Sequence, residues 1–528
     1  MSIRALRPTA ILVGFLLLVA AYLYFFTSVE VAWGGFFAML VFYALIFAFG
    51  SYAATLRGTN DETEVMLAGR NVPLGIAVFT MSATWVGGGF INGTAEYTAD
   101  SGLVWVQAPW GYALSLFVGG LFFAKPMRTR GYKTMLDPLA ERFGKRMAAV
   151  LFLPALTGEI FWTGAILTAL GTTFGTVLGI DTAPAIVLSA AIAVAYTALG
   201  GLWAVALTDV VQMTLLLAGL GIVLPFALGS AGGLEAAWLA YETKFGAAAT
   251  LLPTREALGN YYWYWWDFAL LLVFGGIPWQ VYFQRVLSAR DARTARRLSY
   301  FAAMICLIAA VPAVLIGIVG AVTDWSAMGL PAPPDAASTL PWVVRYLTNP
   351  WVAAIGLGAV AAAVMSSVDS SILSAGSMLS WNVVRPLFRP NLSSENLAKL
   401  IKRCIWIIGT AATLLALNVQ SVYELWFLCS DFVYCLLFPQ LVCALFDPKA
   451  NRTGSMIGFG LAFVLRFGGG EAALNLPALI PYGMVEDGVS LFPFRTLAMV
   501  AGLLGIVVGS RVFGNGVRIS DSDTSRSV

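Results

Sequence analysis

The chain alternates between long apolar runs and short stretches that are rich in charged and turn-forming residues. A helix that crosses a bilayer needs about 20 predominantly apolar residues. Candidate runs lie at 9–27, 32–54, 72–98, 104–124, 147–179, 183–204, 206–229, 262–284, 298–323, 350–384, 400–420, 421–446, 453–468 and 493–513. This pattern predicts an all-α polytopic membrane protein with about 14 transmembrane spans.

The first run, 9–27, also fits the apolar part of a signal peptide, because it follows the basic residues Arg4 and Arg7. No convincing small-residue cleavage site follows it, so we interpret it as a retained helix. Residues 1–54 are then expected to form N-terminal flanking helices.

The basic residues predict the orientation of the spans. With a cytosolic N-terminus and alternating spans, the inner side receives all of the 31 Lys and Arg residues except Lys244, Arg255, Arg345, Arg466 and Arg495. Cytoplasmic loops carry such an excess of positive charge. We therefore expect both termini, including a short tail at 514–528, in the cytosol, and the long loops 230–261 and 324–349 outside.

Composition supports this class and excludes several others. Hydrophobic residues make up 59% of the chain and charged residues 11%, whereas about a quarter of a soluble domain is charged. The absence of histidine excludes His-based catalysis and His metal ligation. The five cysteines lack metal-site spacing and are expected to be small buried residues. A net charge of +3 without a basic block argues against nucleic-acid binding, so we expect a membrane protein that is not an enzyme.

Two spans contain residues that break helices. Gly87–Gly89 interrupts the third run, and Gly275–Pro278 interrupts the eighth. Glycine costs a helix about 1 kcal/mol relative to alanine, and proline costs about 3 kcal/mol. Breaks at corresponding positions of two halves mark the substrate site of many secondary transporters. The alternative is two ordinary kinks in a tightly packed bundle.

The two breaks lie five spans apart, so the interrupted helices are expected to run in opposite directions. This spacing predicts a five-plus-five inverted repeat, with the first five helices at 72–229 and the second five at 262–446. Residues 453–513 would then form C-terminal flanking helices.

The tenth span carries small and hydroxyl side chains on one helical stripe, with a carboxylate at its margin. Close helix packing explains Ala363, Ser366, Ser367, Ser370 and Ser374. It does not explain Asp369, because an ionisable group at membrane depth is costly and usually functional. Hydroxyl, carboxylate and carbonyl oxygens favour an alkali cation over a transition metal. Other acidic residues at or near membrane depth, several of them expected to be interfacial or paired, are Glu96, Glu159, Asp209, Asp267, Glu424 and Asp431.

Several segments together resemble the sodium/solute symporter family, and within it the high-affinity choline transporters. The likeness extends over about residues 65–513. Its motifs are Phe79–Glu96, Gly120–Arg128, Thr134–Pro138, Gly276–Gln280, Tyr282–Val286, Ala363–Ser367 and Phe492–Phe494. The chain differs from the family in its additional N-terminal span, and it lacks the long cytosolic tail of the animal members.

The resemblance implies a LeuT-type core that couples sodium entry to solute uptake across the plasma membrane, with chloride as a further dependence. It assigns a main sodium site to the carbonyls of Ala83, Val86 and Ala363 and the hydroxyls of Ser366 and Ser367. A second sodium site would use Asp369, Ser370 and Asp209. The choline pocket would be an aromatic box of Trp85, Tyr112, Trp162, Trp279 and Trp426.

Other functions remain open at this stage. The same family transports betaine, proline and sugars, but a carboxylated solute would need an arginine or a free helix N-terminus, and a sugar would need a polar lining. A sensor built on the same scaffold would need a signalling domain, and a channel would need repeated pore loops. Aromatic residues predominate around both breaks, which favours a quaternary ammonium such as choline.

Overall fold

A computed structural model of the protein describes residues 3–26, 33–34, 36–37, 40–41, 44–46, 48–49, 62–199, 202–418, 422–471, 476–486 and 489–513. Most of the predicted second span at 32–54 and all of the tail at 514–528 lie outside the described residues. Every other predicted run is occupied by helix. All five cysteines are buried and free, as expected.

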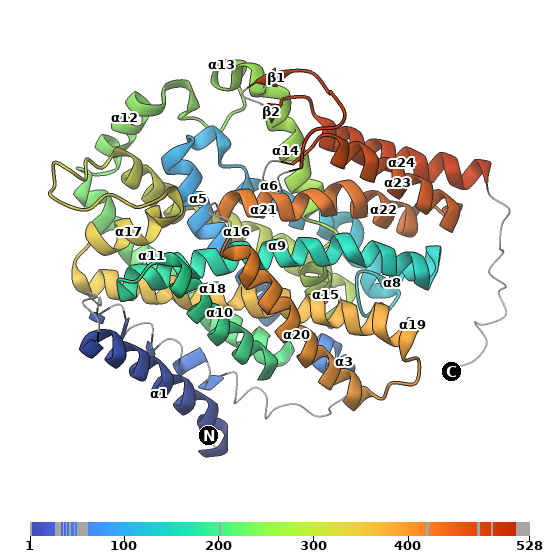
Figure 1. Ribbon diagram of the computed structural model, residues 1–528, viewed down its shortest axis with the longest axis horizontal. Helices are drawn as coiled ribbons and strands as arrows, with labels where there is room; N and C mark the ends of the chain where they lie inside the picture. Colours follow the sequence, from blue (N-terminus) through green and yellow to red (C-terminus); the bar gives the residue numbers. More distant parts are fainter. Residues whose placement is uncertain are drawn as a thin grey trace.

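Long helices form most of the described structure (Figure 1). The unbroken ones are α1 (Ile3–Phe26), α9 (Lys145–Leu178), α10 (Thr182–Leu199), α11 (Leu202–Ser230), α16 (Ala292–Val322), α20 (Ser394–Ala416), α23 (Arg452–Gly468) and α24 (Phe494–Val512). Three further spans contain a π-helical turn: α6 (Ala108–Val118) continues into α7 (Ala124–Thr129), α18 (Pro350–Met378) into the short helix α19 (Arg385–Phe388), and α21 (Val422–Phe432) into α22 (Phe438–Phe446). The helix pairs at the two breaks are α4 (Leu74–Trp85) with α5 (Gly88–Asp100), and α14 (Tyr262–Gly275) with α15 (Gln280–Ser288).

Short elements connect these helices. They are α3 (Glu62–Leu67), α8 (Asp137–Phe143), α12 (Leu234–Phe245), α13 (Arg255–Leu258), α17 (Thr339–Tyr346), α19 (Arg385–Phe388), and the antiparallel strands β1 (Val485–Glu486) and β2 (Val489–Ser490). The two long connections predicted to lie outside therefore contain helices of their own, α12 and α13 in 230–261 and α17 in 324–349.

Within the described residues, nine helices are long and apolar enough to cross a membrane, or ten if α4 and α5 form one bent span. The helices α10, α20 and α23 occupy three further predicted runs but are not among these. The protein is therefore a helical multi-pass membrane protein, and the count of 14 spans stays a prediction.

Both predicted breaks are present, and the first is narrower than the glycine run. The chain leaves the helix at Val86 and Gly87 and bends by 48° between α4 and α5. Gly88 and Gly89 already belong to α5. A Cβ on Gly88 would lie 2.5 Å from Val364 of α18, so this glycine permits a close helix approach. In the second break, Trp279 has an extended backbone before α15 begins.

The broken helix α4–α5 lies against α11, α16 and α18, while α9 packs against α10, α18, α20 and α21. The second broken pair meets the same centre, because α15 contacts both α4 and α18. Figure 1 shows α9, α16 and α18 passing through the middle of the bundle. This arrangement brings the two breaks to a shared, buried region.

A buried network of charges joins the C-terminal helices to the core. Asp431 of α21 accepts from Arg466 of α23 at 2.7 Å and from Arg495 of α24 at 2.9 Å. Asp267 of α14 accepts from the backbone N–H of Arg495 at 3.2 Å. Glu471 adds a second carboxylate to Arg466 at 2.5 Å. The expectation that some membrane acidic groups are paired is thus met for Asp267 and Asp431.

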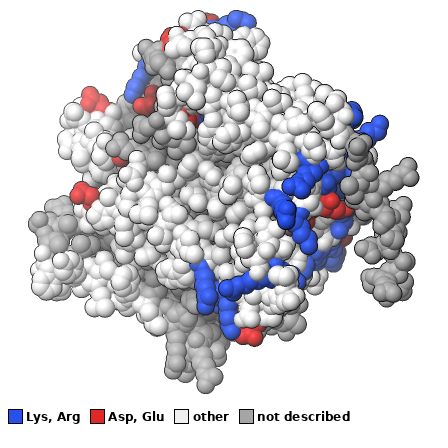
Figure 2. All heavy atoms as spheres, turned by 45° about the vertical axis from the view of Figure 1, so that its right-hand side comes forward, with Lys and Arg blue, Asp and Glu red and all other residues white. Residues whose placement is uncertain are grey.

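Another ion pair ties α3 to the connection between α7 and α8. Lys133 Nζ lies 3.0 Å from Glu62 Oε1, and the Ser394 hydroxyl at the start of α20 donates to Glu62 Oε2 at 2.5 Å. The Ser394 hydrogen bond is the main cause that lowers the pKa of Glu62 to about 2, with Lys133 assisting. Lys and Arg side chains gather in the lower and right-hand part of the face shown in Figure 2.

Removing the shared carboxylate of the C-terminal network should strongly destabilise the fold. In Asp431→Asn, two buried guanidinium groups lose their common partner, and breaking a buried pair costs about 3–5 kcal/mol. The matched control is Asp447→Asn, whose partner Arg511 is 45% exposed, so its cost should stay below about 1 kcal/mol. Unfolding of the two purified variants in detergent, followed by tryptophan fluorescence, measures the difference. Equal losses would show that the network contributes no special stability.

Candidate functional site

Serine hydroxyls of α18 meet the carbonyl groups at the end of α4. Ser366 Oγ lies 3.0 Å from the carbonyl oxygen of Ala83 and 2.6 Å from that of Ala363. Ser367 Oγ lies 3.4 Å from the Ala83 oxygen and 3.0 Å from the Thr84 oxygen. Four of the five residues assigned to the main sodium site therefore lie together. Their oxygen atoms are the hard ligands that an alkali cation prefers.

Val86, the fifth residue of that set, is buried in the break itself. The neighbouring Gly87 approaches α18 so closely that a Cβ there would lie 1.9 Å from Ser367 Oγ. Only a glycine allows the broken segment to reach the serines at this distance. The sequence of the break thus determines how near the freed carbonyls come to α18.

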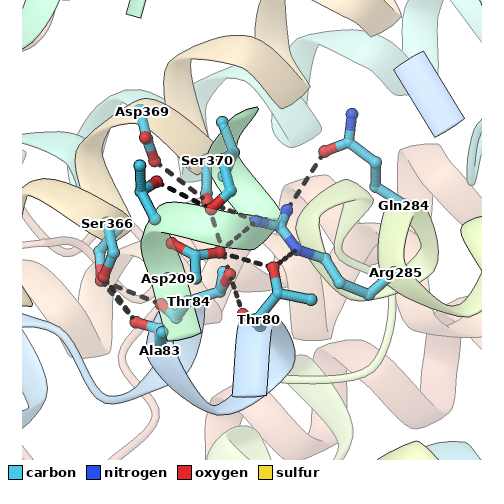
Figure 3. Close-up of polar contacts among 12 residues, drawn as sticks. Thr80, Ala83, Thr84, Asp209, Gln284, Arg285, Ser366, Asp369 and Ser370 are labelled. Atoms are coloured by element: carbon cyan, nitrogen blue, oxygen red, sulfur yellow. Dashed lines mark hydrogen bonds and ion pairs between the residues drawn. The ribbon is translucent and has the colours of Figure 1, made fainter. Parts of the chain in front are cut away.

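Hydroxyl and carboxylate groups continue one turn further along α18. Ser370 Oγ lies 3.3 Å from Asp369 Oδ1 and 3.4 Å from Thr84 Oγ1 (Figure 3). On the facing side, Thr80 of α4 donates to Asp209 Oδ2 of α11 at 2.5 Å. These side chains are all at most 2% exposed. The three residues assigned to a second sodium site, Asp369, Ser370 and Asp209, therefore line one buried region.

Arg285 of α15 lies in the middle of this region. Its guanidinium donates to Ser370 Oγ at 2.5 Å and lies 3.6 Å from Asp209 Oδ2. Two weaker contacts reach Thr80 Oγ1 at 3.4 Å and Gln284 Oε1 at 3.3 Å. Figure 3 shows these residues converging from α4, α11, α15 and α18. Arg285 has no exposed side-chain surface.

The sequence-based assignment of Arg285 to an inner loop was therefore wrong. A charged residue marks the end of the apolar run at 284, whereas the helix α15 continues to Ser288. Every residue of α15 is buried. The position of Arg285 could have indicated its role in the site. It lies within Tyr282–Val286, one of the segments that carry the family resemblance, directly after the second break.

Glu159 of α9, one of the acidic candidates, contacts the serine stripe of α18. Ser371 of α18 donates to Glu159 Oε2 at 2.7 Å and lies 2.8 Å from Thr163 Oγ1. Glu159 is 1% exposed, and Trp162 follows it on the same helix. These contacts connect the serine stripe of α18 with α9. Of the other acidic candidates, the Glu424 side chain lies outside the described residues.

All five residues assigned to the aromatic box form one cluster. The ring centroids of Trp85 and Tyr112 are 5.0 Å apart, and those of Trp85 and Trp162 are 5.8 Å apart. Trp162 continues the chain of contacts to Trp279 at 5.5 Å, and Tyr112 continues it to Trp426 at 4.9 Å. Each ring is at most 2% exposed.

Hydrogen bonds orient part of this aromatic cluster. Trp279 Nε1 donates to the Gly275 carbonyl at 2.7 Å, across the second break. The Tyr112 hydroxyl is hydrogen-bonded to Ser430 of α21. Trp85 Nε1 is buried and has no hydrogen-bond partner among the described residues. Trp85 ends α4 and Trp279 ends the second break, so each break contributes one ring to the aromatic cluster.

A multi-pass helical protein with two interrupted helices around buried oxygen ligands has the architecture of a secondary transporter. The sequence profile of the sodium:solute symporter family matches residues 65–461. The chain therefore belongs to this family, as a sodium-coupled symporter and not an enzyme.

Two relatives are nearly half identical to this chain over the residues that align. The high-affinity choline transporter 1 of Drosophila melanogaster is 46% identical over 485 residues, which cover 89% of this chain and 76% of the relative. The high affinity choline transporter 1 of Homo sapiens is 46% identical over 487 residues, with coverages of 89% and 83%.

Among solved structures, the chain is similar to the substrate-bound, outward-open state of a Na+-coupled sialic acid symporter. The TM-score is 0.75, the sequence identity is 18%, and the match covers 91% of this chain and 98% of the other. This likeness supports the fold that the resemblance predicted.

Gly87→Ala should impair sodium binding, because its Cβ would displace Ser367 or the broken segment. We expect the half-saturating sodium concentration to rise about tenfold or more, equivalent to about 1.4 kcal/mol. Gly75→Ala is the matched control, since a Cβ at Gly75 of α4 meets nothing within 4 Å. Sodium titration of the thermal unfolding of each purified variant measures the effect. An unchanged titration in a folded Gly87→Ala protein would remove Ser367 from the ion site.

Proposed function

We propose that this protein takes up choline together with sodium, by alternating access across the plasma membrane. The observation that carries the proposal is the buried cluster of five aromatic rings, which includes one ring at each helix break. The names of the two relatives support choline as the solute. Family membership supports sodium as the coupling ion.

An aromatic box suits the chemistry of choline. Its trimethylammonium group carries a permanent charge and has no N–H to donate. A ring face within about 6 Å attracts such a cation by about 2 kcal/mol or more when both are desolvated. It also provides apolar contact for the methyl groups. A carboxylate would attract choline too, but it would attract sodium and protonated amines equally well.

The proposed sodium site is directly connected to this box. Ala83 supplies a carbonyl to the ion site, and Trp85 lies two residues further along the same broken segment. A sodium ion held by Ala83, Val86, Ala363, Ser366 and Ser367 would fix the backbone that directs Trp85. Sodium binding would thereby organise the choline site, which is the coupling that a symporter needs.

The remaining parts of the proposal concern organisation and further ions. Asp369, Ser370 and Asp209 form a second cation site. Helices in 72–229 and 262–446 form two five-helix inverted repeats of the LeuT type, with flanking helices in 1–54 and 453–513. Both termini, including the tail at 514–528, lie in the cytosol, and chloride assists transport as the resemblance implies.

The contacts of the site argue against the other solutes of the family. A carboxylated solute such as betaine or proline would need a cationic partner, but Arg285 is engaged with Ser370 and Asp209. A sugar would need several polar side chains where the five rings stand. The arrangement therefore favours a quaternary ammonium.

Removing a ring at either break should weaken choline uptake. Trp85→Leu and Trp279→Leu should each raise the half-saturating choline concentration about tenfold or more, because a cation–π partner of about 2 kcal/mol is lost. Trp→Phe at the same positions should lose less, since a smaller ring face remains. Uptake of radiolabelled choline into proteoliposomes with an inward sodium gradient measures both effects.

The control for these variants is Trp351→Leu, because Trp351 is 81% exposed. Ethanolamine, which lacks the methyl groups, should compete poorly with choline. Strong competition by ethanolamine, or unchanged choline affinity in both leucine variants, would contradict the aromatic box. Absence of sodium-driven choline uptake by the unmodified protein would refute the function itself.

The proposed orientation is testable by cysteine labelling in intact cells. Arg130→Cys and Arg293→Cys should resist an impermeant thiol reagent, because both exposed positions belong to the predicted cytosolic side. Ser326→Cys, exposed in the predicted outer loop, should react. The unmodified protein gives the baseline, since its five cysteines are buried. Labelling at 130 or 293 from outside would reverse the topology.

A further inference from the structure

The guanidinium group of Arg285 occupies the place where a second cation is proposed to bind. It donates to Ser370 at 2.5 Å and lies 3.6 Å from Asp209. Ser370 and Asp209 belong to the second cation site proposed above. Figure 3 shows the guanidinium facing both, with the carboxylate of Asp369 on the far side of Ser370.

The charges around Arg285 do not balance. Three buried carboxylates, Asp209, Asp369 and Glu159, lie near enough to a single guanidinium to act on it electrostatically, and each is at most 1% exposed. Within the described part of the chain, Asp209 Oδ1, Asp369 Oδ2 and Glu159 Oε1 have no hydrogen-bond partner. Buried charges are normally paired, so this region has room for further positive charge.

Ser370 cannot serve Arg285 and a sodium ion at the same time without strong repulsion. A cation bound to Ser370 Oγ would lie within a few ångströms of the guanidinium nitrogen that already contacts this oxygen. Two like charges at that distance in a buried site repel each other strongly. The Ser370 hydroxyl can donate its proton to Asp369 or Thr84. The guanidinium and a sodium ion, however, cannot both occupy the place beside Ser370 Oγ.

We propose that Arg285 is a tethered cation that competes with sodium for the second site. In the conformation described here the guanidinium neutralises Asp209 and blocks Ser370. Sodium that binds to Ser370 and Asp369 displaces the guanidinium, which keeps Thr80 and Gln284 as hydrogen-bond partners on its own side. When sodium leaves, the arginine returns and the carboxylates are never left without a counter-charge. This inference rests on the second cation site of the proposed function.

The location of Arg285 gives this exchange a structural consequence. Arg285 lies on α15, which begins directly after the second break, and its partners lie on α4, α11 and α18. Movement of the guanidinium away from Ser370 would therefore loosen the contact between α15 and α18, while the hydrogen bond to Thr80 still joins α15 to α4. Sodium binding at α18 would change the contacts of the segment that follows Trp279.

The test compares sodium binding by Arg285→Gln, Arg285→Lys and the unmodified full-length protein. Sodium is titrated against thermal unfolding in detergent without choline, with N-methylglucamine holding the ionic strength constant. Arg285→Gln removes the competitor, so the half-saturating sodium concentration should fall about fivefold or more, equivalent to about 1 kcal/mol. Arg285→Lys keeps the charge near Thr80 but is too short to reach Ser370, so we expect a fall of about twofold, equivalent to about 0.4 kcal/mol.

A structural role for Arg285 predicts the opposite result. If the arginine only pairs Asp209, both variants should bind sodium more weakly or unchanged, and either result in a folded variant overturns the proposal. Arg285→Lys decides the question if Arg285→Gln does not fold, because it retains a positive charge in the buried region near Thr80. Arg466→Lys is the control, since Arg466 is equally buried and paired with an aspartate, and its sodium affinity should not change. Choline binding to the unmodified protein at saturating sodium is measured separately, so that failure of the proposed function is distinguishable from failure of this inference.

Discussion

The backbone carbonyls at the end of α4 need partners inside the membrane, and the architecture of the centre follows from this requirement. Unsatisfied polar groups cost several kcal/mol in hydrocarbon, so a broken helix persists there only against protein or a polar cavity. Ser366 and Ser367 of α18 lie at hydrogen-bond distance from the carbonyl oxygens of Ala83 and Thr84. Gly87 makes this approach sterically possible. Serines that satisfy the break in one arrangement are also positioned to share its carbonyls with a cation in another.

The two buried ionic regions of the described structure differ in how completely their carboxylates are paired with arginines. In the C-terminal network, Asp431 bonds to both Arg466 and Arg495, and each arginine reaches a second carboxylate. In the centre, one guanidinium pairs with Asp209, and Asp369 and Glu159 act on it only electrostatically. Each of the three carboxylates has one oxygen without a hydrogen-bond partner among the described residues. Two like charges about 4 Å apart repel by about 4 kcal/mol at an effective dielectric constant near 20. The C-terminal network therefore resembles a fixed link between helices. The centre around Arg285 has the excess of carboxylates over basic groups that is expected of a site that exchanges ions.

The sequence predicted the features that leave a local signature. Glycine and proline within apolar runs indicated both breaks, because they disfavour helix regardless of their surroundings. The serine stripe with Asp369 was visible through helical spacing. The aromatic partners Tyr112, Trp162 and Trp426 are far apart in the chain, and only the family resemblance grouped them before the fold brought them together. The burial of Arg285 could not be predicted, because hydropathy counts treat a charged residue as the end of a span. Its charge is compensated by Asp209, which lies on another helix 76 positions earlier in the chain.

The coupling of ion and solute has a physical path through two helices. α18 provides Ser366 and Ser367 to the broken segment that ends in Trp85, and it provides Ser371 to Glu159 of α9. α9 carries Trp162 less than one turn after Glu159, and Trp162 contacts both Trp85 and Trp279. A shift of α18 toward a bound cation would thus act on Trp85 directly and on Trp162 through α9. Because the rings of Trp85 and Trp162 contact each other, neither ring can move without the other. In the proposed mechanism the aromatic cluster would therefore respond as a unit to an ion at the serine stripe, which is what a symporter requires if solute is to bind together with its ion.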